Sequence, residues 1–179
     1  MHSAGTHGAG RCPVITLVLG GARSGKSLVA ERLAARCPPP VTYLATLAVG
    51  EDAELGLRVA AHRARRPAAW CTLEVASGLP DALRRLAGTA LVDSLGAWLA
   101  GHEGLAVDTD GLCAALLARA GDTVLVSDEV GLGVHPSSEV GRHFRDALGS
   151  LNQAVAAVAD RVLLVVAGRV LTLASAEDG

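Results

Sequence analysis

The chain has 179 residues, a formal net charge of -2 at pH 7, and hydrophobic residues at 50% of its positions. This length suits one domain with a sizeable core, and no apolar run approaches the roughly 18 residues that cross a bilayer, so no membrane insertion is expected. The balanced charge and a total of two tryptophans, one tyrosine and one phenylalanine argue against a nucleic-acid partner, which would need basic and stacking surfaces.

The first segment, "MHSAGTHGAGRC", lacks the basic start, apolar centre and small-residue cleavage site of a secretory signal. We therefore predict a flexible tail over residues 1–13 and a cytoplasmic protein. The four cysteines, Cys12, Cys37, Cys71 and Cys113, form no C-x-x-C pair that would indicate a zinc or redox site. We expect their side chains to be reduced and packed.

The segment "VITLVLGGARSGKSLVAERLAARC" contains a candidate nucleotide-binding loop. Residues 14–19 are apolar, which predicts a buried strand, and a helix is expected after the glycine-rich turn. Between them, Gly20, Gly25, Lys26 and Ser27 match G-x-x-x-x-G-K-[ST], the pattern of a P-loop. Such a loop binds phosphates through backbone N–H groups and a helix N-terminus. Lys26, the only lysine among 16 basic residues, would reach the β and γ phosphates, and the Ser27 hydroxyl would contact Mg²⁺.

The rest of the chain alternates predicted strands and helices, the pattern of a mostly parallel sheet. Strands are expected over residues 41–46, 70–75, 89–93 and 122–129, and a helix from about 52 to 65. A long amphipathic helix is expected after Ser138, with an inner face formed by Val140, Phe144, Leu148, Leu151, Val155 and Val158. "RVLLVVAGRVLTL" predicts two strands joined by a tight Ala-Gly turn. We predict one domain over residues 14–174 and a short tail over residues 175–179.

Acidic side chains stand at the ends of two predicted strands. Asp93 follows "TALV", and Asp128 and Glu129 follow "TVLVS". In an open α/β sheet, ligands bind beyond the carboxyl ends of the strands, so each carboxylate is placed to hold the metal of a nucleotide. Each could equally cap the next helix, and the sequence leaves these two roles open.

The segment "RVAAHRARRPAAW" places one histidine among four arginines. On a helix, Arg58, His62, Arg65 and Arg66 share one face, because they are three or four residues apart or adjacent. Such a basic face is usually solvated. The neighbouring guanidinium groups would also disfavour imidazolium and so help to keep His62 neutral and nucleophilic. The residues by themselves leave a surface role and a catalytic role open.

The motifs occur in an order and spacing that resemble the bifunctional adenosylcobinamide kinase / adenosylcobinamide-phosphate guanylyltransferase family of cobalamin biosynthesis. They are "GGARSGKS", "YLAT", "HRARRPAAWCTLE", "VSDEVGLGVHP", "RHFRDALGSLNQAVAAVAD" and "LLVVAGRVLTL", and the resemblance extends from Val14 to Leu173. It implies an α/β fold of the P-loop NTPase type, with a RecA-like, mostly parallel sheet flanked by helices, and a homotrimer. It also implies two reactions. Adenosylcobinamide is phosphorylated with ATP or GTP, and GMP from GTP is then transferred to adenosylcobinamide phosphate, giving adenosylcobinamide-GDP and pyrophosphate.

The resemblance also implies a set of site residues. His62 matches the histidine that carries GMP as a covalent phosphoramidate, and Lys26 is the lysine of the P-loop. Nucleotide contacts are implied for Gly20, Gly21, Ala22, Arg23, Ser24, Gly25, Lys26, Ser27, Ala45, Thr46, Leu47, Arg63, Ala64, Arg65, Arg66, Glu74 and Asp93. The first candidates to hold Mg²⁺ are Ser27 and Asp93, followed by Asp128 and Glu129.

Three other functions fit parts of this pattern. A small-metabolite kinase without guanylyl transfer would keep the P-loop and leave His62 structural. A guanine-nucleotide switch would normally need an N-K-x-D motif, which a chain whose only lysine is Lys26 cannot contain. A DNA-associated RecA-like ATPase would need a basic or aromatic nucleic-acid surface. The bifunctional enzyme is therefore the preferred prediction.

Overall fold

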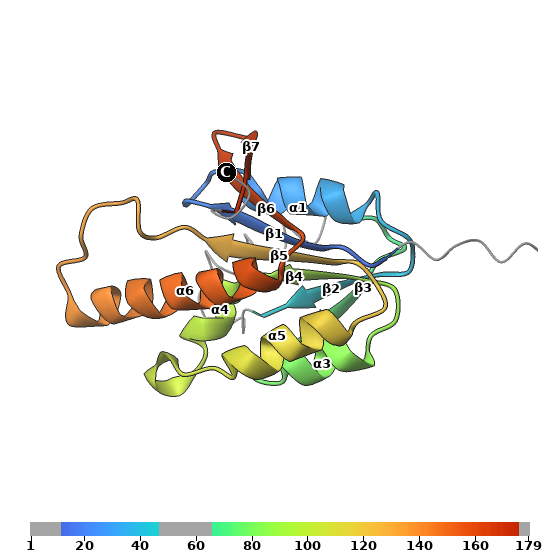
Figure 1. Cartoon of the computed structure of the whole chain (residues 1–179), viewed down its shortest axis with the longest axis horizontal. Helices are drawn as coiled ribbons and strands as arrows, with labels where there is room; N and C mark the ends of the chain where they lie inside the picture. The colour runs from blue at the N-terminus through green and yellow to red at the C-terminus, as the bar shows by residue number, and fades with distance from the viewer. Residues whose placement is uncertain (1–11, 47–65, 176–179) are drawn as a thin grey trace, which may run out of the picture.

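A computed structural model describes residues 12–46 and 66–175. These residues form a seven-stranded sheet in the order β3-β2-β4-β5-β1-β6-β7 (Figure 1). The strands are β1 (Ile15–Gly20), β2 (Val41–Ala45), β3 (Cys71–Glu74), β4 (Thr89–Asp93), β5 (Thr123–Asp128), β6 (Arg161–Val166) and β7 (Arg169–Leu173). Neighbouring strands are parallel except β6 and β7, which form the antiparallel hairpin expected across the Ala-Gly turn. The predicted α/β fold with a mostly parallel sheet is confirmed.

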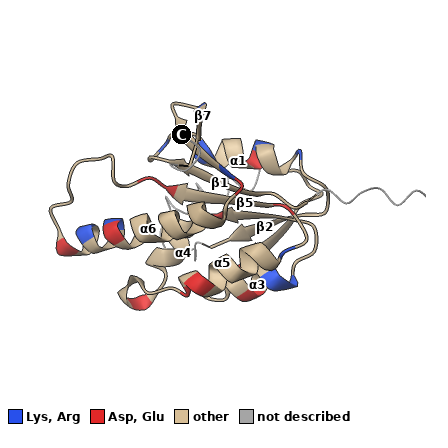
Figure 2. Ribbon diagram, in the orientation of Figure 1, with Lys and Arg blue, Asp and Glu red and all other residues tan. Residues whose placement is uncertain are grey.

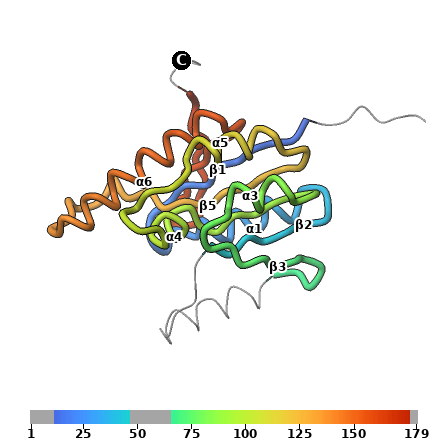
Figure 3. The backbone as a smooth tube through the Cα atoms, turned by 90° about the horizontal axis from the view of Figure 1, so that it is seen from below, coloured from blue at the N-terminus to red at the C-terminus, as the bar shows by residue number. Residues whose placement is uncertain are grey.

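Helices cover both faces of the sheet. They are α1 (Lys26–Ala34), α3 (Leu79–Arg85), α4 (Leu95–Ala100), the 3-10 helix η1 (Glu103–Leu105), α5 (Thr109–Ala118) and α6 (Glu139–Val158). Helix α1 lies on one face, and α3, α4, α5 and α6 lie on the other, which is the side nearer the viewer in Figure 3 (Figures 1 and 3). Three of these helices begin at a side-chain cap, supplied by Ser94, Asp108 and Ser138.

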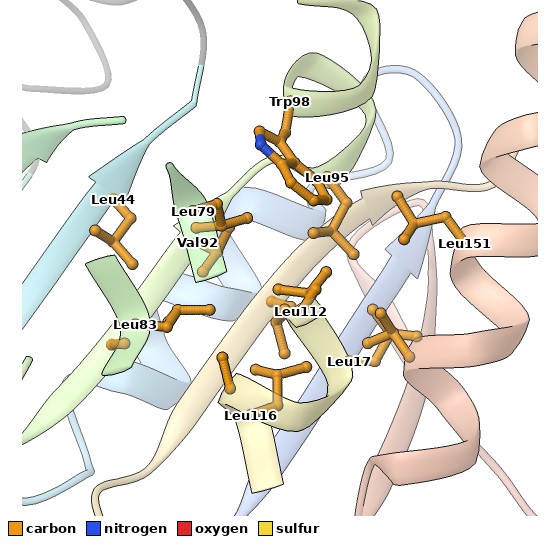
Figure 4. Close-up of a cluster of buried hydrophobic side chains, with 14 of the residues drawn as sticks. Leu17, Leu44, Leu79, Leu83, Val92, Leu95, Trp98, Leu112, Leu116 and Leu151 are labelled. Atoms are coloured by element: carbon orange, nitrogen blue, oxygen red, sulfur yellow. The ribbon is translucent and has the colours of Figure 1, made fainter. Parts of the chain in front are cut away.

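A buried apolar layer lies between the sheet and the helices on each face. The larger layer, under α3 to α6, includes Leu17, Leu44, Val92, Leu95, Trp98, Leu112 and Leu116 (Figure 4). The smaller layer, under α1, includes Val18, Ala30, Ala34, Tyr43, Leu91 and Val126. Because successive side chains of a strand point to opposite faces, a strand covered on both faces is apolar at nearly every position. This is why β1, β4 and β5 could be recognised as uninterrupted apolar runs.

The carboxyl ends of the six parallel strands, β1 to β6, meet along one edge of the sheet. In the register of these strands, Gly20 pairs with Asp128, and Ala45 pairs with both Asp93 and Glu74. Figure 2 shows acidic residues at this end of β5, while most other charged residues lie on the helices. We call this region the carboxyl edge; it comprises residues 20–27, 45–46, 74, 93 and 128–129. The sheet thus gathers the predicted phosphate loop and the predicted acidic residues in one place.

Two expectations about burial were wrong. Val140 is 75% exposed, because the first turns of α6 extend beyond the sheet, whereas Leu148, Leu151 and Val155 are buried as predicted (Figure 1). All four cysteines are free thiols, but Cys12 and Cys71 are exposed and not packed. The helix expected over residues 52–65 lies outside the described residues, and the predicted domain limits stay a prediction. Across residues 12–46 and 66–175, no helix is long and apolar enough to cross a membrane.

Candidate active site

The P-loop runs from the end of β1 into the first turn of α1. Gly25 has a φ of 92°, a left-handed conformation that favours glycine. A Cβ on Gly20 would lie 2.5 Å from Ser24 Oγ and 2.8 Å from the Val165 carbonyl oxygen, so a side chain would not fit there. The N-cap residue of α1 is Gly25, which has no side chain, and the first turn of the helix is free of acidic residues. Ser24 Oγ accepts the Lys26 N–H at 3.3 Å, and no other side chain accepts from this turn in the described part of the chain. The positive end of this helix is therefore open to an anion.

Lys26 is held inside this loop by two oxygen atoms. Its Nζ lies 2.7 Å from Asp128 Oδ1 and donates to the Gly21 carbonyl oxygen at 3.2 Å. Asp128 is itself held in place, since Asn152 Nδ2 donates to its backbone oxygen at 3.0 Å and Gly96 of α4 packs against its carboxylate. The two charged side chains are 13% and 35% exposed. An incoming phosphate could thus replace either of the oxygen atoms that now contact the ammonium group.

Asp93 lies beside the serine of the P-loop. Ser27 Oγ donates to Asp93 Oδ1 at 3.4 Å, and the Tyr43 hydroxyl donates to Asp93 Oδ2 at 2.8 Å. Burial, reinforced by the Asp93 carboxylate, raises the pKa of Tyr43 far above its usual range, so the hydroxyl keeps its proton. Helix α4 is capped by Ser94, which accepts the Ala97 N–H at 3.2 Å. The cap considered for Asp93 is therefore supplied by its neighbour.

Glu129 has surroundings unlike those of Asp128. Its carboxylate oxygens accept the N–H groups of Gly131 and Leu132 at 2.8 and 3.0 Å, which closes the turn after β5. Of the three predicted acidic ligands, Asp93 is the one that contacts the P-loop serine, whereas Asp128 contacts Lys26 and Glu129 contacts its own turn. Within residues 12–46 and 66–175, no three histidine, cysteine or acidic side chains cluster closely enough to hold a metal by themselves.

The other predicted contacts lie at the ends of β2 and β3. Thr46 Oγ1 donates to the Ser94 carbonyl oxygen at 2.6 Å, which joins the end of β2 to the start of α4. Glu74 lies two strands from Asp93, because Ala45 is the register partner of both, and this corresponds to a backbone separation of about 10 Å. It lines a separate pocket of about 460 Å³ between β3 and α3. Other polar residues of this pocket are Ser77, Asp81 and Arg85.

One member of the predicted basic segment can be placed. The structure describes Arg66, whose guanidinium carbon lies 3.2 Å from the centre of the Tyr43 ring. Arg66 Nη1 also donates to Thr72 Oγ1 at 3.3 Å. The remaining predicted residues of this region lie outside the described residues; they are Leu47, His62, Arg63, Ala64 and Arg65.

Sequence reasoning missed the part of Tyr43 in this site. The side chain contacts both Asp93 and Arg66, two of the predicted nucleotide ligands. One signal was present, because Tyr43 is the only tyrosine of the chain, just as Lys26 is the only lysine. That signal was weak, since an aromatic residue in a buried strand normally serves packing.

The fold and the site define a protein of the P-loop NTPase class. A strand leads through the glycine-rich loop into a helix, and at this junction Lys26 contacts Asp128 and Ser27 contacts Asp93. A solved structure described as a prototypical ATPase from the type III secretion system of pathogenic bacteria superposes with a TM-score of 0.52. It is 11% identical, and the match covers 93% of this chain and 60% of that one. At this identity the likeness concerns the fold alone.

Sequence comparison places the chain more narrowly. A family model described as "Cobinamide kinase / cobinamide phosphate guanyltransferase" matches residues 16–173. The bifunctional adenosylcobalamin biosynthesis protein CobP of Pseudomonas aeruginosa is 45% identical over 161 residues, 85% of this chain and 92% of that protein. The corresponding protein CobU of Salmonella typhimurium is 37% identical over 177 residues, 87% of this chain and 97% of that protein. The chain belongs to the cobinamide kinase / cobinamide phosphate guanyltransferase family of bifunctional transferases, which fits the preferred prediction and not the kinase-only alternative.

Proposed function

We propose that the chain phosphorylates the aminopropanol hydroxyl of adenosylcobinamide with ATP or GTP and then transfers GMP from GTP to that phosphate. The products of the second reaction are adenosylcobinamide-GDP and pyrophosphate. The observation that carries the proposal is the carboxyl edge, where Lys26 contacts Asp128 and Ser27 contacts Asp93 in a chain that matches the family over residues 16–173. Both reactions require a firmly held triphosphate, and one P-loop can serve both.

In the first reaction, the substrate hydroxyl oxygen attacks the γ-phosphorus. An O–P bond forms, the bond from the γ-phosphorus to the bridging oxygen breaks, and the hydroxyl proton is released. The backbone N–H groups of the loop and the N-terminus of α1 hold the phosphates. Lys26 exchanges its contacts with Asp128 and Gly21 for phosphate oxygens, and its charge stabilises the leaving group.

In the second reaction, a neutral ring nitrogen of His62 attacks the α-phosphorus of GTP and pyrophosphate leaves. A phosphate oxygen of adenosylcobinamide phosphate then attacks the same phosphorus, breaks the P–N bond and regenerates the imidazole. His62 lies outside the described residues, so its part rests on the segment "HRARRP". Arg66 of that segment lies over the Tyr43 ring, which supports a role for its guanidinium group in binding the phosphates.

The residues beside the P-loop suit Mg²⁺. Ser27 Oγ and Asp93 Oδ1 lie 3.4 Å apart, and both are hard oxygen donors. Mg²⁺ usually takes one or two protein oxygens and completes its shell with phosphates and water, which agrees with this small set. We propose that Ser27 and Asp93 hold it. A bound Mg²⁺ would supply positive charge that neutralises the phosphates of the nucleotide.

Glu74 is proposed to contact the guanine nucleotide. It lines the pocket of about 460 Å³ between β3 and α3, which lies within the range of volumes typical of small-molecule sites. Its carboxylate can accept hydrogen bonds only, and the N–H groups of a guanine base are suitable donors. Ala45 and Thr46 lie between this pocket and Asp93, which supports a nucleotide laid across the carboxyl edge.

A homotrimer is proposed from the family resemblance. The loop before α6 and the first turn of α6 carry exposed apolar side chains at Leu132, Val134 and Val140, which supports a contact between subunits there. Sedimentation equilibrium should therefore give three times the mass of the chain. A monomer at micromolar concentration would contradict this proposal.

GTP labelled at its α-phosphate tests the function directly. The wild-type protein should acquire a covalent label that is stable in base and labile in acid, as expected of a phosphoramidate. His62→Ala should abolish both the label and guanylyl transfer and retain phosphorylation of adenosylcobinamide. His135→Ala, which changes an exposed histidine that is not one of the carboxyl-edge residues, is the matched control and should label normally. An unlabelled wild-type protein would favour the kinase-only function, and a labelled His62→Ala protein would place the nucleophile elsewhere.

A further inference from the structure

Tyr43 lies where two predicted nucleotide ligands meet. It is on β2, 4% exposed, in the apolar layer under α1. Its hydroxyl donates to Asp93 Oδ2 at 2.8 Å, and its ring lies 3.2 Å from the guanidinium carbon of Arg66. Neither the P-loop pattern nor the acidic strand ends include this residue.

The hydroxyl is not explained by packing. A phenylalanine would fill the same space, and a buried hydroxyl is unfavourable unless it is hydrogen-bonded. Here the partner is Asp93, whose other carboxylate oxygen accepts from Ser27 at 3.4 Å. Because each oxygen is bonded to a different donor, the plane of the carboxylate is fixed. Oδ1 is thereby kept facing the serine of the P-loop.

The ring has a separate effect on Arg66. A guanidinium group over an aromatic face is stabilised by a cation–π interaction, which is stronger when the pair is shielded from water. Arg66 Nε is buried and has no hydrogen-bond partner in the described part of the chain. Its Nη1 contacts Thr72 Oγ1 at 3.3 Å. The stacking on Tyr43 is therefore a principal contact that holds the guanidinium plane.

We infer that Tyr43 is a positioning residue for the nucleotide site: its hydroxyl orients Asp93 toward Ser27, and its ring seats Arg66. The inference rests on the proposed function, in which Asp93 holds Mg²⁺ and Arg66 binds the phosphates. The hydroxyl thus acts on Asp93, which holds Mg²⁺, and the ring acts on Arg66, which binds the phosphates of the same nucleotide. The two parts of the side chain can be removed separately by substitution.

Tyr43→Phe removes the hydroxyl and keeps the ring. Binding of GTP, measured by calorimetry without Mg²⁺, should stay within about 2-fold of wild type, because Arg66 remains seated. The gain in affinity on adding Mg²⁺ should fall about 10-fold, as expected for the loss of a hydrogen bond to a charged group. The Mg²⁺ concentration that gives half-maximal rate should rise by a similar factor. In the double variant with Asp93→Asn, Tyr43→Phe should have little further effect.

Tyr43→Leu removes the ring as well. It should weaken metal-free GTP binding about 5-fold, and this loss should disappear when Arg66 is already alanine. Thr42→Val is the matched control, because Thr42 is buried on the same strand and points to the opposite face of the sheet. It should bind GTP like wild type with and without Mg²⁺. Thermal unfolding of every variant reports whether the protein is folded.

Two outcomes would overturn the inference even if the proposed metal site is correct. One is Mg²⁺ dependence in Tyr43→Phe equal to wild type while Asp93→Asn is impaired. The other is a loss of GTP affinity in Tyr43→Phe that is equal with and without Mg²⁺, which would indicate a general structural defect. Asp93→Asn is measured on its own, so a failure of the proposed metal site is distinguishable. If that variant keeps wild-type Mg²⁺ dependence, the metal assignment is wrong, and the positioning role of the Tyr43 hydroxyl is wrong with it.

Discussion

Charged side chains lie at both ends of the parallel strands, at the carboxyl edge and at the opposite end where the strands begin, which we call the amino edge. The charges at these two edges have opposite roles. At the amino edge, Arg119 is 6% exposed, and burial lowers its pKa. Its guanidinium group donates to the carbonyl oxygens of Leu83, Leu86 and Gly88 and to Thr123 Oγ1, at 2.6 to 3.1 Å. These bonds join the ends of α3 and α5 to the starts of β4 and β5. A ligand could not capture this charge without breaking the fold.

At the carboxyl edge the charges contact one another and the P-loop. Lys26 contacts Asp128 and one carbonyl oxygen, and Asp93 contacts two hydroxyl groups. The contacts of Lys26, and that of Ser27 with Asp93, can be replaced by a phosphate or a metal without opening the core. Whether a charged side chain is structural or functional is therefore indicated more by the groups that it contacts than by its burial. Substitutions at both edges test that distinction, beginning with the largest expected effect.

Lys26→Ala should affect function and leave stability nearly unchanged. We expect both phosphorylation and guanylyl transfer to fall about 10³-fold, because each needs this charge on the same triphosphate. The melting temperature should shift little, since Asp128 is 35% exposed and can be solvated. Steady-state rates of both reactions and a thermal melt measure this. Arg32→Ala, which changes an exposed residue in the last turn of α1, is the control. Near-normal rates in Lys26→Ala would refute the shared site.

Arg119→Met should do the reverse. It leaves three backbone carbonyl oxygens without this donor, and we expect the free energy of unfolding to fall by about 3 kcal/mol. The folded fraction should retain wild-type kcat. Urea unfolding measures the loss, and Arg84→Ala serves as control, because the exposed Arg84–Asp81 pair should contribute roughly 0.5 kcal/mol. Equal losses in the two variants would remove the contrast between the edges.

Asp93→Asn should lower Mg²⁺-dependent turnover by about 10- to 100-fold, because an amide oxygen is a poorer Mg²⁺ ligand than a carboxylate. Nucleotide and Mg²⁺ titrations of the rate measure this. The fold should be kept, since asparagine can still accept from Tyr43 or Ser27. Unchanged titrations would make Asp93 a structural residue, like those of the amino edge.

Asp128→Asn should have a smaller effect on a different quantity. The variant loses the charge opposite Lys26, and we expect kcat/KM for the nucleotide to change by about 5-fold. The Mg²⁺ concentration for half-maximal rate should stay at the wild-type value. A shift in that concentration as large as in Asp93→Asn would mean that Asp128 also holds the metal.

Glu129→Gln should have the smallest effect. Glutamine keeps one acceptor for the turn N–H groups of Gly131 and Leu132, so we expect a stability loss of about 0.5 to 1 kcal/mol. Both rates should stay within about 2-fold of wild type. Chemical unfolding and the two activity assays measure these quantities. A large loss of Mg²⁺ affinity in this variant would restore the metal role considered from the sequence.

The amino-acid sequence by itself determined the features that depend on neighbouring residues. The P-loop follows from glycines at fixed spacing between a strand and a helix, and β1, β4, β5 and the β6–β7 hairpin follow from local apolar patterns and turn residues. The burial of α6 was only partly predictable. A period of three and four marks an apolar face, but it does not reveal where the partner sheet ends, and Val140 lies beyond it.

Only the tertiary structure decided which acidic residue meets which part of the P-loop. Asp93 and Asp128 both end apolar strands, and the sequence treats them alike. The order β4-β5-β1 places Asp128 against Lys26 and leaves Asp93 beside Ser27 and Tyr43. The contacts of Tyr43 with Arg66 and of Arg119 with three separate segments arise in the same way. Such pairings depend on strand order and packing between segments far apart in the chain, and local sequence patterns do not encode them.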